Sequence, residues 1–268
     1  MKRIFSFKLV LVVITLVFLN SCSKDNNGVN IFTVDDDMQL GLQMEQEIQA
    51  DPASYPLLQR SQYPLAYQHL EEVRDAILGT GLVEYDTKFE WNVHIIMNDT
   101  VLNAFCTPGG YIYFYSGIIK YLDNEAQFAG VMGHEMAHAA RRHSTQQMTK
   151  AYGLEILLSV ILGENPNLLA QMAADLAAGV TMLAFSRDDE YESDEYSVKY
   201  LYETSYDARG VAGFFEKIDG SPQPPEFLST HPNPGNRVEK INEIWLGLGG
   251  KEGEEYPERY QQFKNSLP

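Results

Sequence analysis

The sequence predicts an α+β fold that is mostly helical and contains one small β-sheet. Residues 89–97 alternate apolar and polar side chains, as a half-buried strand does, and a second strand over 111–115 follows the turn at 108–110. Apolar residues recur at helical spacing in six segments, at 35–50, 66–78, 124–148, 187–204, 208–218 and 233–246. Neither an internal repeat nor a second domain is apparent, so we expect one folded domain over 35–248.

The first three helices carry recognisable end signals. The acidic residues 35–37 lie in the first turn of the first helix, and Gly79 and Gly81 close the second. Asn124 and Gln127 can form a capping box at the start of the third. These signals support the helix boundaries that the apolar spacing predicts.

Two further apolar stretches, 152–162 and 168–185, are separated by the polar turn 163–167 and predict a helical hairpin. Glu155 and Asp175 interrupt the two stretches. A charged side chain inside a bilayer is costly, so we expect a core hairpin rather than one that touches a membrane.

The composition excludes several classes of protein. The chain has 268 residues, of which 44% are apolar, which is typical of a folded protein with a sizeable core. The chain contains 20 Lys and Arg residues and 37 Asp and Glu residues. The resulting net charge of -17 disfavours nucleic-acid binding. Only two cysteines occur, Cys22 and Cys106, so any metal must use histidines and carboxylates.

The N-terminus has the features of an export signal. Basic residues precede an apolar run over 9–19, which is too short to span a bilayer, so residues 1–21 are predicted to be a signal peptide. The motif Leu-x-Ser-Cys that ends at Cys22 resembles a bacterial lipobox. We therefore expect a lipoprotein whose lipidated Cys22 anchors it to a membrane of the bacterial cell envelope, through a tether over 22–34. The outer membrane is favoured, at its periplasmic face or at the cell surface.

The strongest chemical signal is an HExxH pattern at 134–138, on the third predicted helix. His134 and His138 are one helical turn apart, so both imidazoles can reach one cation from the same face. Glu135 can then act on a water at the metal instead of binding the metal. A chain of this composition would contain this pattern by chance about 0.01 times, so a coincidence is improbable.

The third ligand must come from outside this pattern. If the helix continues, His143 lies about 180° around it from His134, on the opposite face. The segment 186–194 offers several carboxylates, and Glu190 and Asp194 share one helix face as an i, i+4 pair. Glu192 is the alternative, and spacing alone does not choose between Glu190 and Glu192.

With these motifs in place, the chain resembles family 48 of the metallopeptidases, which are zinc gluzincins. The resemblance covers most of residues 38–246 and is carried by four segments in the family's order: Asn103-Ala104-Phe105 with Pro108-Gly109-Gly110; the HExxH pattern with 142–144 beyond it; Ser186, Arg187, Glu190 and Asp194; and 229–232 followed by Arg237. It implies a gluzincin-like fold, in which the HExxH helix packs on a small sheet with an edge strand over the metal.

The resemblance also implies roles for individual residues at the metal. One Zn²⁺ would be held by His134, His138 and Glu190, with Asp194 orienting a ligand and Arg237 nearby. Such a centre leaves one position open for water, which is the arrangement of a catalytic zinc site. The implied activity is that of a zinc metalloendopeptidase with Glu135 as general base.

His231 is the candidate for a further role at the metal. The family places a His-Pro segment near the metal, so His231 could donate a hydrogen bond to the developing oxyanion. The donor role is the one we favour from the sequence, but His231 could instead occupy the open position and hold the enzyme off, or simply cap the next helix.

The substrate implied by the resemblance is an extended polypeptide that adds a strand to the sheet. The expected binding segment comprises Asn103, Ala104 and Phe105, followed by the turn with Gly109 and Gly110. Backbone pairing selects for extension more than for sequence, which suits unfolded or misassembled proteins of the cell envelope. The alternative function is a chaperone or assembly lipoprotein that uses the zinc fold for binding, although an intact Glu135 argues against it.

The remaining expectations concern the C-terminus and the isolated histidines. No repeat domain follows Leu246 and no spanning helices occur, so we expect a compact, soluble lipoprotein branch of the family. The acidic segment 249–268 is expected to be a loosely packed tail. His69 and His94 lack clustered partners and are expected to be structural or on the surface.

Overall fold

The computed structural model of the chain describes residues 30–152, 185–219, 227–232 and 235–268, with scattered positions between 156 and 171. The predicted signal peptide, the predicted anchor residue Cys22 and most of the predicted hairpin over 152–185 lie outside these residues. Among the helices described, none is both long enough and apolar enough to span a lipid bilayer.

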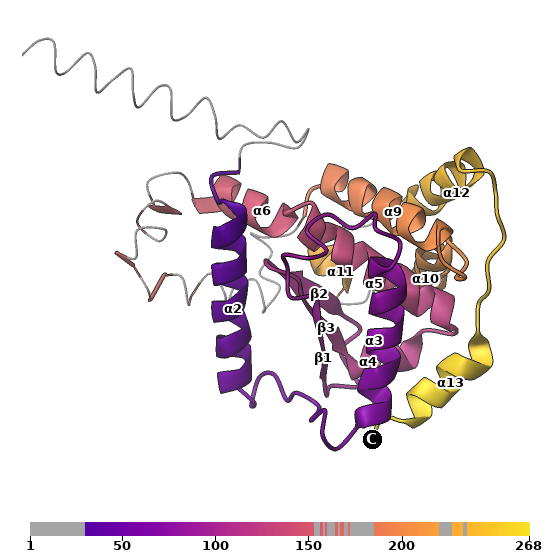
Figure 1. The fold of residues 1–268 in the computed structure, drawn as a ribbon, viewed down its shortest axis with the longest axis horizontal. Helices are drawn as coiled ribbons and strands as arrows, with labels where there is room; N and C mark the ends of the chain where they lie inside the picture. Colours follow the sequence, from indigo (N-terminus) through magenta and orange to yellow (C-terminus); the bar gives the residue numbers. More distant parts are fainter. Residues whose placement is uncertain are drawn as a thin grey trace, which may run out of the picture.

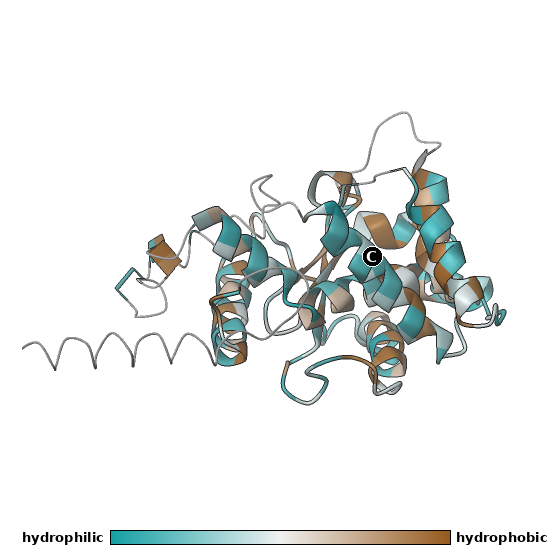
Figure 2. Ribbon diagram, turned by 90° about the horizontal axis from the view of Figure 1, so that it is seen from above, coloured by the Kyte–Doolittle hydropathy of each residue, from teal (hydrophilic) through white to brown (hydrophobic). Residues whose placement is uncertain are grey.

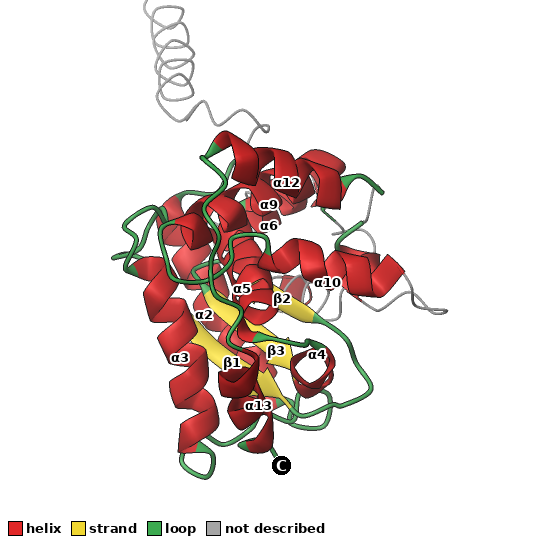
Figure 3. Cartoon of the chain, turned by 90° about the vertical axis from the view of Figure 1, so that its right-hand side faces the viewer, coloured by secondary structure: helices red, strands yellow, loops and turns green. Residues whose placement is uncertain are grey.

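The described chain is mostly helical and has one three-stranded sheet, which confirms the predicted fold class (Figures 1 and 3). The strands are β1 (Asn92–Ile96), β2 (Ala104–Thr107) and β3 (Tyr111–Tyr115). The helices are α2 (Val34–Ala50), α3 (Pro64–Leu78), α4 (Ser116–Tyr121), α5 (Glu125–Ala140), α6 (His143–Tyr152), α9 (Arg187–Tyr202), α10 (Gly210–Asp219), α11 (Phe227–Thr230), α12 (Arg237–Gly247) and α13 (Pro257–Asn265).

The sheet has the strand order β1-β3-β2, so β2 lies at one edge. β3 pairs in parallel with β1 and antiparallel with β2, where Ala104 lies opposite Phe114. The turn between β2 and β3 contains Gly109 and Gly110, whose φ angles of 75° and 86° lie in the left-handed region that favours glycine. The predicted turn at 108–110 is therefore confirmed.

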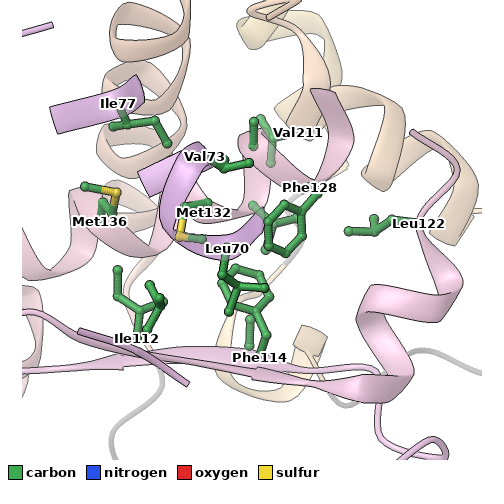
Figure 4. Close-up of a cluster of buried hydrophobic side chains, with 14 of the residues drawn as sticks. Leu70, Val73, Ile77, Ile112, Phe114, Leu122, Phe128, Met132, Met136 and Val211 are labelled. Atoms are coloured by element: carbon green, nitrogen blue, oxygen red, sulfur yellow. The ribbon is translucent and has the colours of Figure 1, made fainter. Parts of the chain in front are cut away.

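One face of the sheet packs on α5 and α3 and forms the main core. Because side chains alternate along a strand, Ile112 and Phe114 of β3 both face this layer. Figure 4 shows them opposite Phe128, Met132 and Met136 of α5, and all five side chains are completely buried. This contact places the HExxH helix directly on the sheet, as predicted.

The opposite face of the sheet is covered in part by α2. Tyr111 and Tyr113, which alternate with the core residues of β3, form a second apolar cluster with Ile48. Beside this cluster, His94 Nε2 lies 3.1 Å from Glu45 Oε1. His94 is therefore structural, as expected from its isolation in the sequence.

The predicted helix over 124–148 is wrong in one respect, because it is two helices. The α5 helix ends at Ala140, α6 begins at His143, and between them Arg142 has a φ of 62°. This left-handed conformation is unfavourable for a side chain with a Cβ. It is compensated here by an ion pair between Arg142 and Asp37 and by a 2.6 Å hydrogen bond from Arg142 Nη2 to the carbonyl of Phe32.

The expectation of a loosely packed C-terminal tail is also wrong. In α13, Tyr260 and Phe263 are three residues apart on one face, and both are buried in the main core. The ring of Phe263 stacks on His69 of α3 at 4.4 Å, and α13 lies beside the end of α3 in Figure 1. His69 is therefore also structural. The acidic residues of the segment face solvent, and Figure 2 shows helices striped with hydrophilic and hydrophobic residues, as helices that cover a core should be.

Candidate metal centre

The site forms where α5 packs against α9 and α10. Gly130 of α5 allows this packing, because a Cβ at this position would lie 2.2 Å from the backbone nitrogen of Val211 in α10. Its carbonyl accepts a 2.8 Å hydrogen bond from Ser197 Oγ of α9. One turn further along α5, the helix presents His134, Glu135 and His138 to the interior.

Four donor groups converge in this interior. The Nε2 atoms of His134 and His138 lie 3.0 Å apart, and Glu190 Oε1 of α9 lies 3.4 Å from His138 Nε2. His231, which follows α11, places Nδ1 3.1 Å from Glu190 Oε1 and 3.3 Å from His134 Nε2. One donor atom from each residue lies within 4.8 Å of the others, and all four side chains are completely buried.

This arrangement fits a metal cation. His134 Nδ1 contacts Asp194 Oδ1 at 2.9 Å, so Nδ1 carries the proton and Nε2 presents a lone pair to the cluster. A second imidazole nitrogen and a carboxylate lie around the same point, and a cation shared by these buried groups would remove the repulsion between their lone pairs. Neither oxygen of Glu135 receives an N–H or O–H hydrogen bond from the described residues.

Asp194 and Arg237 hold His134 in place. Arg237 donates to both carboxylate oxygens of Asp194, from Nε to Oδ2 and from Nη2 to Oδ1, each at 2.6 Å. Its Nη1 also lies 2.8 Å from Glu190 Oε2. Paired donation of this kind fixes the carboxylate, which in turn fixes the tautomer and orientation of His134. The structure thus brings together both supporting residues that the resemblance implied.

The interior shifts the pKa values of Glu190, His138 and Glu135 in different directions. Burial tends to raise the pKa of Glu190, but His231 and Arg237 outweigh it and hold that pKa well below the usual range. Burial lowers the pKa of His138 well below its usual value, which keeps the ring in the neutral form that binds metals. Burial raises the pKa of Glu135 to about 7, against the opposing effect of His231.

His143 does not lie where a continuous helix would place it. Because the helix is interrupted at Arg142, His143 lies behind His138, with the two Nδ1 atoms 2.9 Å apart. Glu192 contacts His143 and Arg141 and is not among the four converging donors. The geometry therefore favours Glu190 over Glu192 as the third ligand. No local sequence signal marks the helix break at Arg142.

His231 contacts both the donors and the acid beside them. Its ring stacks on Phe227 of α11 at 4.2 Å, and its Nε2 lies 3.5 Å from Glu135 Oε1. The backbone N–H of Phe227 donates to the carbonyl of Leu102, which precedes β2. His231 Nδ1 thus lies among the converging donors, while Nε2 of the same ring faces Glu135.

The predicted binding segment forms the edge strand β2. The backbone carbonyl of Asn103 accepts a 3.1 Å hydrogen bond from the backbone N–H of Tyr115 in β3. Because hydrogen-bonded pairs alternate along an antiparallel ladder, the odd-numbered residues of the segment turn their backbone groups to β3. Ala104 and Cys106 turn theirs to the outer edge. The N–H of Ala104 donates to its neighbour's side chain, Asn103 Oδ1, at 2.9 Å.

The remaining residues of the predicted segment lie around this strand. Phe105 stacks on Tyr113 on the α2 side of the sheet. A Cβ at Gly109 would lie 3.2 Å from the Asp37 carbonyl oxygen of α2, and one at Gly110 would lie 3.0 Å from the backbone nitrogen of Trp91. The two glycines thus fit the turn closely between α2 and Trp91.

The fold and the donor set together define a class, the HExxH metallopeptidases whose third protein ligand is a glutamate from a later helix. The sequence model of peptidase family M48 matches residues 68–245, and the chain belongs to this family.

Several named proteins are similar to the chain. The beta-barrel assembly-enhancing protease of Yersinia pestis is 29% identical over 193 residues, which are 67% of this chain and 40% of that protein. The protein of the same name from Escherichia coli K12 is 30% identical over 191 residues, which are 65% of this chain and 38% of that protein. The mitochondrial metalloendopeptidase OMA1 of Arabidopsis thaliana is 32% identical over 153 residues, which are 56% of this chain and 30% of that protein. The chain thus matches less than half the length of these relatives.

Proposed function

We propose that the chain is a zinc-dependent endopeptidase that cleaves extended polypeptides. The observation that carries the proposal is the buried convergence of His134, His138 and Glu190 beside the carboxylate of Glu135. Membership of peptidase family M48 supports the same reaction class.

Zinc is the metal that this set of donors favours. Two imidazoles and one carboxylate are the protein ligands of many catalytic zinc sites, whereas magnesium and calcium prefer oxygen ligands alone. His134, His138 and Glu190 would hold the ion, which when bound would lower the pKa of a water and polarise the substrate carbonyl.

Glu135 is the proposed general base. Its pKa of about 7 allows the carboxylate to take a proton from the attacking water and to return it to the leaving nitrogen. Its oxygens receive no N–H or O–H hydrogen bond from the described residues, and they are contacted by the Cys106 thiol and by His231 Nε2, which lies 3.5 Å from Oε1. The cleavage thereby adds one water across one peptide bond, with no net change in the protonation of Glu135.

His231 is proposed to regulate this site. With Nδ1 beside Glu190 and His134 and Nε2 facing Glu135, one imidazole lies next to the ligands that would hold the ion and next to the base, where it would compete with a water. Hydrolysis would then require His231 to move aside. If His231 stays near the carbonyl after this movement, it can also donate to the oxyanion.

The proposed substrate pairs with the outer edge of β2. Ala104 and Cys106 turn their backbone groups to this edge, because the odd-numbered residues of the segment make the backbone hydrogen bonds to β3. A strand added there would depend on its own backbone N–H groups and on an extended conformation. Unfolded or misassembled polypeptides meet this requirement, whereas compact folded proteins do not.

The proposed location is the bacterial cell envelope, with the protein anchored by lipids on Cys22, most simply to the outer membrane. The support is the leader-like sequence over 1–21, the lipobox-like motif at Cys22 and the similarity to proteins named beta-barrel assembly-enhancing protease. Misassembled envelope proteins would then be the natural substrates.

Backbone methylation tests the mode of binding. A synthetic peptide that the enzyme cleaves would be compared with two N-methylated forms of the same peptide. In one form every second backbone nitrogen is methylated, and in the other the methyl groups are moved by one residue, so that they lie on the opposite edge of the extended peptide. We expect one methylated isomer to lose most of its cleavage, because it cannot pair with β2, and the other to retain it. Equal cleavage of all three peptides would contradict strand addition without affecting the metal centre.

A further inference from the structure

The second metal-facing histidine is backed by another imidazole. His138 directs Nε2 to the converging donors, while its Nδ1 lies 2.9 Å from Nδ1 of His143. Both rings are completely buried and meet edge to face, with centroids 5.0 Å apart. His143 reaches this position because the helix breaks at Arg142, where φ is 62°, and α6 begins at His143.

The contact continues from His143 to a carboxylate on α9. His143 Nε2 lies 3.1 Å from Glu192 Oε2, and Glu192 Oε1 accepts a 2.9 Å hydrogen bond from Arg141 Nε. Arg141 is itself held by a 2.6 Å bond from Nη1 to Glu84. The series therefore ends, as on the His134 side, in a carboxylate that an arginine fixes.

One proton arrangement satisfies the contacts of His138, His143 and Glu192, beside which Ser193 Oγ lies 3.3 Å from His143 Nδ1. An imidazole that offers Nε2 to a metal carries its proton on Nδ1, so His138 donates from Nδ1 to the Nδ1 lone pair of His143. With Nδ1 of His143 accepting, its Nε2 carries a proton and donates to Glu192. The carboxylate accepts, and no donor faces another donor along the series.

We propose that His143 and Glu192 are positioning residues of the metal centre, which hold His138 in the tautomer and orientation that bind the ion. They play for His138 the part that Asp194 plays for His134. The inference rests on the proposed metal centre and adds two residues to it.

The test is the dissociation constant for Zn²⁺, measured on the metal-free full-length protein by competition with a chelating dye. His143→Phe keeps a ring of similar size but removes the acceptor, and we expect the constant to rise about 10- to 100-fold. In His143→Asn the side-chain oxygen takes the place of Nδ1 but the contact with Glu192 is lost, so the constant should rise only about threefold to tenfold, less than in His143→Phe. His94→Gln is the matched control, because His94 also pairs with a glutamate, Glu45, but on the face of the sheet away from the metal, and its constant should not change.

A second pair of variants tests the far end of the series without disturbing the core. Glu192→Gln should raise the constant about threefold to tenfold, less than His143→Phe because it lies one step further from the ligand. Glu195→Gln is its control, since Glu195 lies on the same helix and pairs on the surface with Lys199. The Glu195 variant should bind Zn²⁺ as the wild type does.

Two outcomes would overturn the inference while leaving the metal centre intact. One is wild-type affinity in folded His143→Phe or, should that variant not fold, in Glu192→Gln. The other is an equal loss in the Phe and Asn variants of His143, because that would assign the effect to volume and not to the acceptor. Absence of Zn²⁺ binding by the wild type would overturn the proposed metal centre and this inference with it.

Discussion

His231 Nε2 lies 3.5 Å from Glu135 Oε1, while Nδ1 of the same ring lies among the donors of the proposed metal centre. If this ring holds the open position, His231→Ala should raise the cleavage of an unfolded protein several-fold while the zinc content stays at one per chain. The measurement is the initial rate of casein cleavage, with metal content determined on the same samples.

The other two roles of His231 give different results. A fall in activity at unchanged zinc content would assign His231 to oxyanion stabilisation. Activity of His231→Ala equal to that of the wild type from pH 6 to pH 8 would exclude both the inhibitory role and the oxyanion-donor role of His231. The residue would then be structural, through its stacking on Phe227.

The identity of the third ligand can be tested by comparing three carboxylates of α9. Glu190→Ala should weaken zinc binding far more than any neighbour, because it removes a ligand. Asp194→Ala should weaken it by about 10- to 100-fold through a misoriented His134, and Glu192→Ala should have the smallest effect. Equal zinc affinity of the Glu190 and Glu192 variants would show that the assignment along α9 is wrong.

The sequence predicts the position of a site residue only where that position follows from the spacing of residues along one helix or strand. His134 and His138 are one turn apart on one helix, so their convergence follows from helix geometry alone. The position of His143 does not, because it requires Arg142 to adopt a left-handed conformation that Asp37 compensates from a helix about a hundred residues earlier. Long-range contacts of this kind leave no periodic trace in the sequence.

The C-terminal segment shows the same limit on a larger scale. Its acidic composition predicts a loose tail, because most of its residues are polar. Two residues, Tyr260 and Phe263, are enough to dock α13 in the core, where the Tyr260 hydroxyl donates 2.7 Å to the carbonyl of Ile119. A short helix with one narrow apolar face falls below what composition can detect.

The docking of α13 predicts a stability effect. Phe263→Ala should lower the free energy of unfolding by about 3–5 kcal/mol, since it removes a buried aromatic ring that stacks on His69. Chemical denaturation of the variant and the wild type, both in excess zinc, checks this value. A change below about 1 kcal/mol would mean that α13 contributes little to the fold.

The lowered pKa of Glu125 predicts how the free energy of unfolding depends on pH. Burial raises the pKa of Glu125, but hydrogen bonds from His69 and Arg259 outweigh it, so the folded-state pKa lies below the ordinary value of 4.5. The stabilisation is then present above about pH 4.5 and is lost as the pH falls through the folded-state pKa. Glu125→Gln should therefore lower the melting temperature at pH 7, and the difference from the wild type should shrink below pH 4.5. A difference that is constant between pH 7 and pH 3 would contradict this.

The proposed anchor can be tested independently of the enzyme activity. In a bacterial host that processes lipoproteins, the wild type should incorporate labelled palmitate and sediment with membranes. Cys22→Ser should do neither, while Cys106→Ser, the other cysteine of the chain, should behave as the wild type. Palmitate incorporation by the Cys22 variant would exclude lipidation at this residue.

The most direct test of the central claim compares zinc content and casein cleavage in the wild type and in Glu135→Gln. Both comparisons should be made with His231 present and with His231→Ala, so that a blocked site is not mistaken for an inactive one. We predict one zinc per chain in every protein, and a loss of cleavage of about 10²- to 10⁴-fold wherever Glu135 is replaced, because the substitution removes the base and leaves all three ligands. Cleavage by the zinc-loaded Glu135 variants at the rate of their parents would contradict the proposal that this site hydrolyses peptide bonds.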